Sequence, residues 1–347
     1  SVLMAASQIA LPWLLRQPWL MLQSLGESLV TLAVVAATLL ALGWGWAVAL
    51  GVGVISMAAS PAVLLRIADD LRASGAVTDR SLLLATISTL LALLGALVLT
   101  VVFVPVAEAA GGGLQFSTAG LGRLLLSLLL TLFWALLVTV AFWPVLRWQS
   151  SRSDTTALYL LAAMAAVCLL AEQWGGSAAL GFVVAGLMLR NFSPMPLVWP
   201  QAFQAAHAML NLLMFVLVAS MASQVNLSWA MVSVVASVVL ARILGKFGSI
   251  LLLGLGTGIG WRRQWPVACG QLALSGLALL MLSGIALQWT AFNASVAQQV
   301  AAIALPVIVV CEVLGVLLAA TALWRSGDAH RGVGRAALQR GGKRHDA

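Results

Sequence analysis

Charged residues are scarce in this sequence. Only 8% of its 347 residues are Asp, Glu, Lys or Arg, whereas soluble domains carry about 25%. Hydrophobic residues make up 62% of the chain, and the mean hydropathy is +1.06. These values exclude a soluble globular domain and indicate a polytopic membrane protein.

Cysteine is also rare, and the motifs of soluble enzymes are missing. Cys168, Cys269 and Cys311 each lie within an apolar segment, without the spacing of metal ligands or of a disulfide framework. The sequence has no Walker loop, no histidine cluster and no nucleophile elbow, and Gly254–Gly260 lacks the glycine spacing of a dinucleotide-binding loop. We therefore expect no enzyme, no cofactor and no resident metal.

Long apolar segments dominate what is present. They predict an all-α polytopic membrane protein of about ten transmembrane helices, within one transmembrane domain over residues 20–324. The predicted spans are residues 20–42, 44–64, 81–104, 123–146, 155–174, 177–190, 203–223, 227–256, 264–288 and 297–324.

The basic residues between these spans are distributed unevenly. If all ten segments cross the bilayer, every Lys and Arg of the loops and tail except Arg123 falls on one side. The positive-inside rule places that side, with both chain ends, in the cytoplasm. The net charge of +8 then reflects membrane topology, so we expect a lipid bilayer, that of the bacterial inner membrane, and no nucleic acid as partner. Residues 325–347 are expected to form a basic cytoplasmic tail.

Two basic residues lie inside a predicted span. Arg242 and Lys246 are at the middle of Val234–Leu253, and their spacing of four places them on one helix face. A cation at the centre of a membrane helix costs about 2.5 to 3.5 kcal/mol on insertion scales. The pair therefore indicates an ion or substrate pathway. The alternative is a structural pair bonded to backbone carbonyls of neighbouring helices.

Two spans carry interruptions near their middles. Small residues precede Pro61 in the second span, and Gly270–Gly276 interrupts the ninth. Each is the central span of a group of three, residues 20–104 and 227–324, which cross the bilayer in opposite directions. Inverted repeats with discontinuous middle helices are typical of transporters. The alternative is that Gly and Pro are simply common in membrane helices.

Four stretches together resemble the monovalent cation:proton antiporter superfamily, of the sodium/hydrogen exchanger and potassium-efflux type. They are Ile55–Leu71 (ISMAASPAVLLRIADDL), Ala171–Leu189 (AEQWGGSAALGFVVAGLML), Leu240–Ser249 (LARILGKFGS) and Val307–Leu318 (VIVVCEVLGVLL). They occur in the order that this family has, and Lys246 falls where electrogenic members place a core lysine.

The resemblance implies a fold of about thirteen helices that works by alternating access. It implies a core built from the two repeats, with residues 123–223 forming linking and dimerisation helices of a homodimer. Compared with that pattern, the chain lacks about three N-terminal helices, and residues 1–19 are expected to be the remnant of a preceding helix and loop.

One departure from the family concerns its acidic pair. Members carry Asp-Asp or Asn-Asp in the helix after the first broken one, whereas Leu82–Leu93 (LLLATISTLLAL) has Ser88 and Thr89 there. Hydroxyl oxygens can bind Na⁺ or K⁺, but they do not titrate as a carboxylate does. Glu312, an acid within the tenth span, is a candidate substitute, with a structural bond to another helix as the alternative.

The resemblance implies exchange of Na⁺ or K⁺ against protons along a pathway through the interrupted helices. Two other functions stay open: a member without proton coupling that acts as a passive cation pathway or a regulatory protein, and an anion transporter that uses Arg242 and Lys246 directly. The expected pathway residues are Ser60, Pro61, Ser88, Thr89, Arg242, Lys246, Ser275, Gly276 and Glu312.

Overall fold

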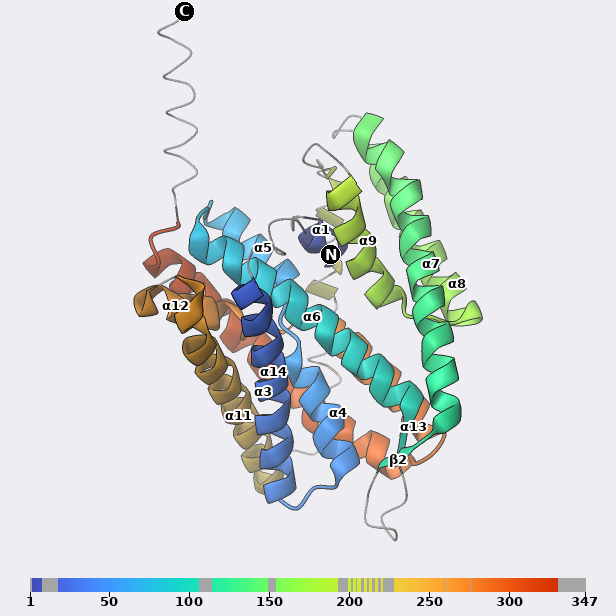
Figure 1. The fold of residues 1–347 in the computed structure, drawn as a ribbon, viewed down its shortest axis with the longest axis vertical. Helices are drawn as coiled ribbons and strands as arrows, with labels where there is room; N and C mark the ends of the chain where they lie inside the picture. Colours follow the sequence, from blue (N-terminus) through green and yellow to red (C-terminus); the bar gives the residue numbers. More distant parts are fainter. Residues whose placement is uncertain are drawn as a thin grey trace, which may run out of the picture.

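The computed structural model describes nearly all of the predicted transporter domain. It covers residues 2–7, 18–105, 114–148, 154–192, 228–258, 260–274 and 276–329, with part of residues 199–220. Helices account for almost all of this, which confirms the all-α prediction (Figure 1). The described strands, β1 (Phe103–Pro105) and β2 (Leu114–Phe116), pair antiparallel between two long helices.

Most helix boundaries fall within a few residues of the predicted spans. The helices are α1 (Val2–Ala6), α3 (Pro18–Ala41), α4 (Trp46–Met57), α5 (Pro61–Asp70), α6 (Ala76–Val102), α7 (Thr118–Trp148), α8 (Asp154–Trp174), α9 (Ala178–Phe192), α11 (Trp229–Leu253), the 3-10 turn η2 (Gly254–Thr257), α12 (Trp261–Gly270), α13 (Gly276–Thr290) and α14 (Ala294–Arg325).

Six helical segments of the described chain are long and apolar enough to cross a membrane. They are α3, α4 together with α5, α6, α7, α11 and α14, and three shorter apolar helices accompany them. Large apolar side chains such as Leu125, Leu129 and Val140 are exposed on α7, as expected of a helix whose outer face meets lipid. The molecule is thus a polytopic membrane protein. The predicted seventh span, residues 203–223, lies largely outside the described residues.

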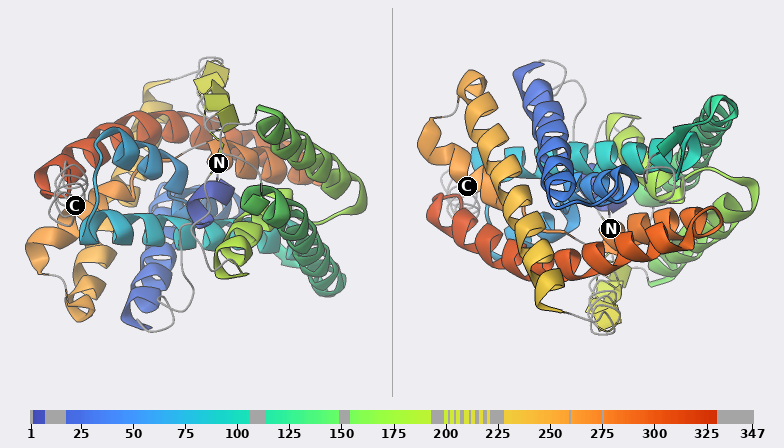
Figure 2. Two further views of the ribbon diagram at one scale, coloured as in Figure 1. Left: turned by 90° about the horizontal axis from the view of Figure 1, so that it is seen from above. Right: turned by 90° about the horizontal axis from the view of Figure 1, so that it is seen from below.

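The helices form two packed groups. The first group contains α3, α4, α5, α6, α11, α12, α13 and α14, which pack around two apolar cores, whereas α1, α7, α8 and α9 share a third core. Figure 1 and Figure 2 show α7, α8 and α9 together at one side, away from α3, α11 and α12. The functional division into repeats and dimerisation helices stays a prediction.

Both predicted interruptions are breaks in the helices. The first lies between α4 and α5, where Ser60 caps the new helix by accepting from the Val63 amide and Pro61 occupies its first turn. The second lies between α12, which ends at Gly270, and α13, which begins at Gly276. The Ser60 amide donates to the Ala273 carbonyl at 2.8 Å. The two breaks therefore touch.

The helices α3 and α11, which begin the two predicted groups of three spans, run antiparallel along each other (Figure 1). A Cβ on Gly245 would lie 3.0 Å from the Thr31 Cα, so the missing side chain lets the backbones approach closely. This close approach brings the polar side chains of both helices to the level of the breaks.

The chain beyond α14 folds back onto the transporter before it leaves the described residues. Asp328 is buried, and its Oδ2 accepts from the Val77 and Thr78 amides, each at 3.1 Å, at the start of α6. These amides have no partner within the helix, so the carboxylate caps α6. Residues 326–329 of the predicted tail therefore pack against the helical body, and residues 330–347 lie outside the described part.

Candidate functional site

Arg242 is fully buried and binds the carbonyls of both breaks. Its Nε donates to the Ser56 carbonyl at 3.1 Å and its Nη2 to the Ala58 carbonyl at 2.8 Å. On the other side, Nη1 donates to Leu272 at 2.6 Å and Nη2 to Gln271 at 3.3 Å. The guanidinium therefore joins the carboxyl ends of α4 and α12.

These bonds follow from how the two helices end. The last turn of a helix leaves carbonyls without an intrahelical partner, and the helix dipole places partial negative charge there. In the interior of a bilayer protein no bulk water can satisfy them. Arg242 supplies donors and positive charge to both ends at once, as the structural interpretation of the pair expected.

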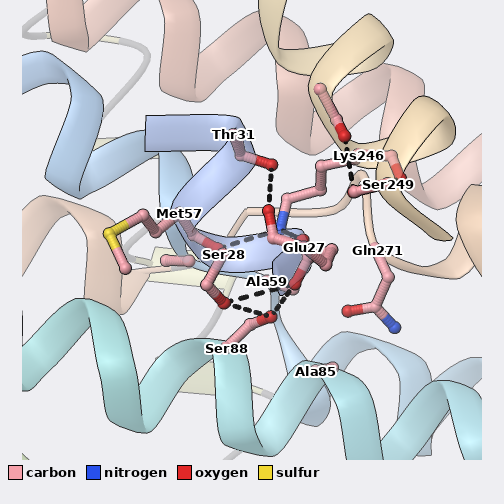
Figure 3. Close-up of polar contacts among 12 residues, drawn as sticks. Glu27, Ser28, Thr31, Met57, Ala59, Ala85, Ser88, Lys246, Ser249 and Gln271 are labelled. Atoms are coloured by element: carbon pink, nitrogen blue, oxygen red, sulfur yellow. Dashed lines mark hydrogen bonds and ion pairs between the residues drawn. The ribbon is translucent and has the colours of Figure 1, made fainter. Parts of the chain in front are cut away.

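Lys246 has a different partner, Glu27 of α3. Its Nζ forms an ion pair with the Glu27 Oε1 and also donates to the Met57 carbonyl at 2.9 Å. Both side chains are fully buried (Figure 3). The buried cation is therefore balanced by a carboxylate from the neighbouring helix α3.

The other oxygen of Glu27 is bound by two hydroxyls. Ser88 of α6 donates to Oε2, and the Ser28 Oγ lies 3.3 Å from the same atom and 3.2 Å from the Ser88 Oγ (Figure 3). One carboxylate, two hydroxyls and one ammonium thus meet at a single point beside the first break. Oxygen ligands of this kind suit a hard cation or a proton, and both would compete with Lys246 for the carboxylate.

Sequence reasoning missed Glu27, although a signal was present. Gln23, Ser24, Glu27, Ser28 and Thr31 repeat at helical spacing within the first apolar span, and all five are buried. The leucines between them face outward. A polar stripe on an otherwise apolar membrane helix indicates a face turned toward the protein interior.

The predicted residues Ser88, Thr89, Ser60 and Pro61 have separate roles in the geometry. Ser88 reaches the Glu27 carboxylate, whereas the Thr89 hydroxyl bonds the Ala59 carbonyl of the first break and the Ala85 carbonyl of its own helix. Ser60 and Pro61 form the start of α5 and make no side-chain bond to Glu27 or Lys246.

The structure does not place the remaining predicted residues at the contact between Glu27, Lys246 and Ser88. Gly276 begins α13, and Ser275 lies outside the described residues. Glu312 is buried on α14, and within the described chain its carboxylate has no hydrogen bond or ion pair that would join it to Lys246. No group of His, Cys, Asp and Glu among the described residues is arranged to hold a metal ion.

Comparisons with known proteins agree with this architecture. The family described as sodium/hydrogen exchanger, transmembrane, matches residues 2–324. Among solved structures, the sodium proton antiporter MjNhaP1 from Methanocaldococcus jannaschii, determined at pH 8, is similar with a TM-score of 0.63 and 15% identity, over 93% of this chain and 82% of that one. Comparison with curated protein sequences gives no significant match. Since the family match spans nearly the whole chain, this protein is a transporter rather than an enzyme and belongs to the sodium/hydrogen exchanger family.

Proposed function

We propose that the protein exchanges Na⁺ or K⁺ for protons by alternating access, with Glu27 as the carboxylate that binds the cation and the proton in turn. Membership of the family supports cation:proton antiport as the class of activity. The sequence raised one difficulty for proton coupling, because Ser88 and Thr89 stand where the family carries an acidic pair. A carboxylate from α3 that contacts Ser88 removes that difficulty.

The observation that carries the proposal is the buried contact of Glu27 with both Lys246 and Ser88. A carboxylate in the membrane interior is expensive unless it is paired or protonated. Glu27 can be neutralised by the Lys246 ammonium, by a proton or by a bound cation. These three states exclude one another at one site, which is the requirement for antiport.

The surrounding oxygens provide ligands for the cation. Ser28 and Ser88 already approach the carboxylate, and the Met57 carbonyl lies 2.9 Å from the Lys246 Nζ. When the ammonium leaves the carboxylate, a cation can take its place between Glu27 Oε1 and this carbonyl. Because the two breaks touch and the site lies within the packed group that contains α3, α6 and α11, movement of that group past α7, α8 and α9 would carry the site with it.

The contacts favour this function over the alternatives. An anion transporter would need cationic donors that face the substrate, yet the hydrogen bonds of Arg242 in the described structure go to four backbone carbonyls. A member without proton coupling would need no titratable group beside Ser88, yet Glu27 contacts it.

Orientation and assembly complete the proposal. The positive-inside distribution supports a cytoplasmic C-terminus in a bacterial inner membrane. Membership of the family supports a homodimer.

Flux measurements test the function directly. The purified protein is reconstituted into liposomes that contain a pH-sensitive dye, and pulses of Na⁺, K⁺ and anions are applied. We expect a dye response to Na⁺ or K⁺ that Glu27→Gln abolishes. Because a proton competes for Glu27, the cation concentration for half-maximal response should rise as the pH falls.

Glu172→Gln is the matched control, since it makes the same chemical change in α8, which belongs to the other packed group. It should leave the response unchanged. Absence of a dye response to every cation would refute antiport, and a full response from Glu27→Gln would refute the role of this carboxylate.

A further inference from the structure

Several buried oxygens beyond those at Glu27 lie in the segments around the two breaks. Among the described residues, four buried side-chain oxygens have no hydrogen-bond partner: Ser24 Oγ, Ser56 Oγ, Ser81 Oγ and Gln271 Oε1. All belong to helices that surround the two breaks. Polar atoms without partners are costly in a membrane protein, so each of them needs an explanation.

Two of the residues that carry these oxygens, Ser81 and Gln271, are in direct contact. The Gln271 Nε2 donates to the Ser81 backbone carbonyl at 2.8 Å, and a Cβ on Gly270 would lie 3.3 Å from the Ser81 Oγ. A carbonyl only accepts, so this bond fixes the amide nitrogen and leaves Oε1 as the free atom. Ser81 and Gln271 are both fully or almost fully buried.

The helix end and Arg242 act on a cation at these oxygens in opposite directions, so its binding there should be weak. Gln271 caps the carboxyl end of α12, where the helix dipole contributes partial negative charge. Arg242 donates to the Gln271 and Leu272 backbone carbonyls, so its positive charge lies close to the Gln271 side chain. Weak binding suits a position that an ion passes through, because conduction requires that the ion can also leave.

The position on α6 connects the group to the main site. Ser81, Ala85 and Ser88 lie on one buried face of that helix at spacings of four and three. Seven residues of helix correspond to about 10 Å. Figure 3 shows the Gln271 side chain beside α6, on which Ala85 and Ser88 are labelled. Ala85, which lies between the two serines on this face, has a short side chain.

We propose that Ser81 Oγ and Gln271 Oε1 form a transit subsite for a partly dehydrated monovalent cation on its way to or from Glu27. The subsite rests on the proposed function for its role in transport. The neutral oxygens replace part of the hydration shell, as backbone carbonyls do in ion-selective pores.

Transport kinetics provide the first test. Ser81→Ala and Gln271→Leu each remove one oxygen ligand, so the KM for the cation should rise roughly twofold to tenfold, while kcat changes little. Ser81→Thr keeps the hydroxyl and should restore the wild-type KM. Thr86→Val is the control, because the Thr86 hydroxyl already bonds the Leu82 carbonyl of the same helix at 2.9 Å. An unchanged KM in both variants, or a loss of kcat alone, would overturn the proposal.

Direct binding provides the second test and does not depend on transport. Crystals of Glu27→Gln are soaked with thallium(I), whose anomalous signal locates a monovalent cation. A thallium peak within ligand distance of Ser81 Oγ and Gln271 Oε1 supports the subsite, and a water molecule in its place refutes it. If the wild type shows no antiport while the peak is present, the proposed function fails and the subsite stands.

Discussion

Removal of one member of the Glu27–Lys246 pair should cost far more stability than removal of both. In Lys246→Met, the Glu27 carboxylate stays buried with only the Ser28 and Ser88 hydroxyls beside its Oε2. In Glu27→Gln, the ammonium keeps the Met57 carbonyl as an acceptor but loses its countercharge. The double variant leaves no unpaired charge. The pair therefore predicts strong non-additivity.

The magnitude follows from the complete burial of both side chains. Breaking a buried ion pair by removing one partner costs about 3 to 5 kcal/mol, whereas replacing both partners by neutral groups is often close to neutral. Each single variant should thus lose about 3 to 5 kcal/mol, and the double variant should recover most of that loss. A proton can neutralise the lone carboxylate, so the deficit of Lys246→Met should shrink as the pH is lowered.

Reversible unfolding of the four proteins in mixed micelles, followed by tryptophan fluorescence, gives the free energies of unfolding for the cycle. The pH is varied for Lys246→Met and, as a comparison, for Glu27→Gln, which keeps no carboxylate and should not show the same recovery in acid. If the double variant loses the sum of the two single losses, the charges do not interact and the account of the site is wrong.

Two further predictions concern the contacts around the site. Arg242→Leu leaves the carbonyls of both breaks without their donor, and each buried carbonyl without a partner costs about 1 to 3 kcal/mol of stability. The yield of folded protein in size-exclusion chromatography should therefore fall sharply, and an unchanged yield would contradict the bridging role. Asp328→Ala removes the cap of α6 and should cost about 0.5 to 2 kcal/mol of unfolding free energy, measured as above, whereas Asp328→Asn should retain part of it. An unchanged free energy of unfolding in Asp328→Ala would show that the cap does not matter.

The overall fold could be predicted because its determinants are local. Apolar runs of membrane length specify the spans, and Pro61 and Gly270 mark the places where α5 begins and α12 ends. The isolated cations Arg242 and Lys246 drew attention to the place where the two breaks meet, because a charge inside an apolar membrane helix is costly unless it is paired. These features can be read within twenty residues of sequence.

The partners in the site could not be predicted in the same way. Glu27 and Lys246 are separated by 219 positions, and only the antiparallel packing of α3 on α11 joins them. The replacement of the acidic pair by Ser88 and Thr89 suggested a loss of proton coupling, because the sequence does not show which side chain of another helix faces that position. Glu312 was singled out instead, although in the described structure the ion pair of Lys246 is with Glu27.

The location of the carboxylate on α3 affects how related chains should be recognised. A search pattern that demands acids on the helix after the first break would discard this chain, although its ammonium is fully compensated. A criterion that asks whether each buried charge lies beside an opposite charge in the folded structure would retain it. Homologues dismissed as inactive for want of that acidic pair should therefore be inspected for a Glu or Asp on the helix that lies antiparallel to the one with the lysine.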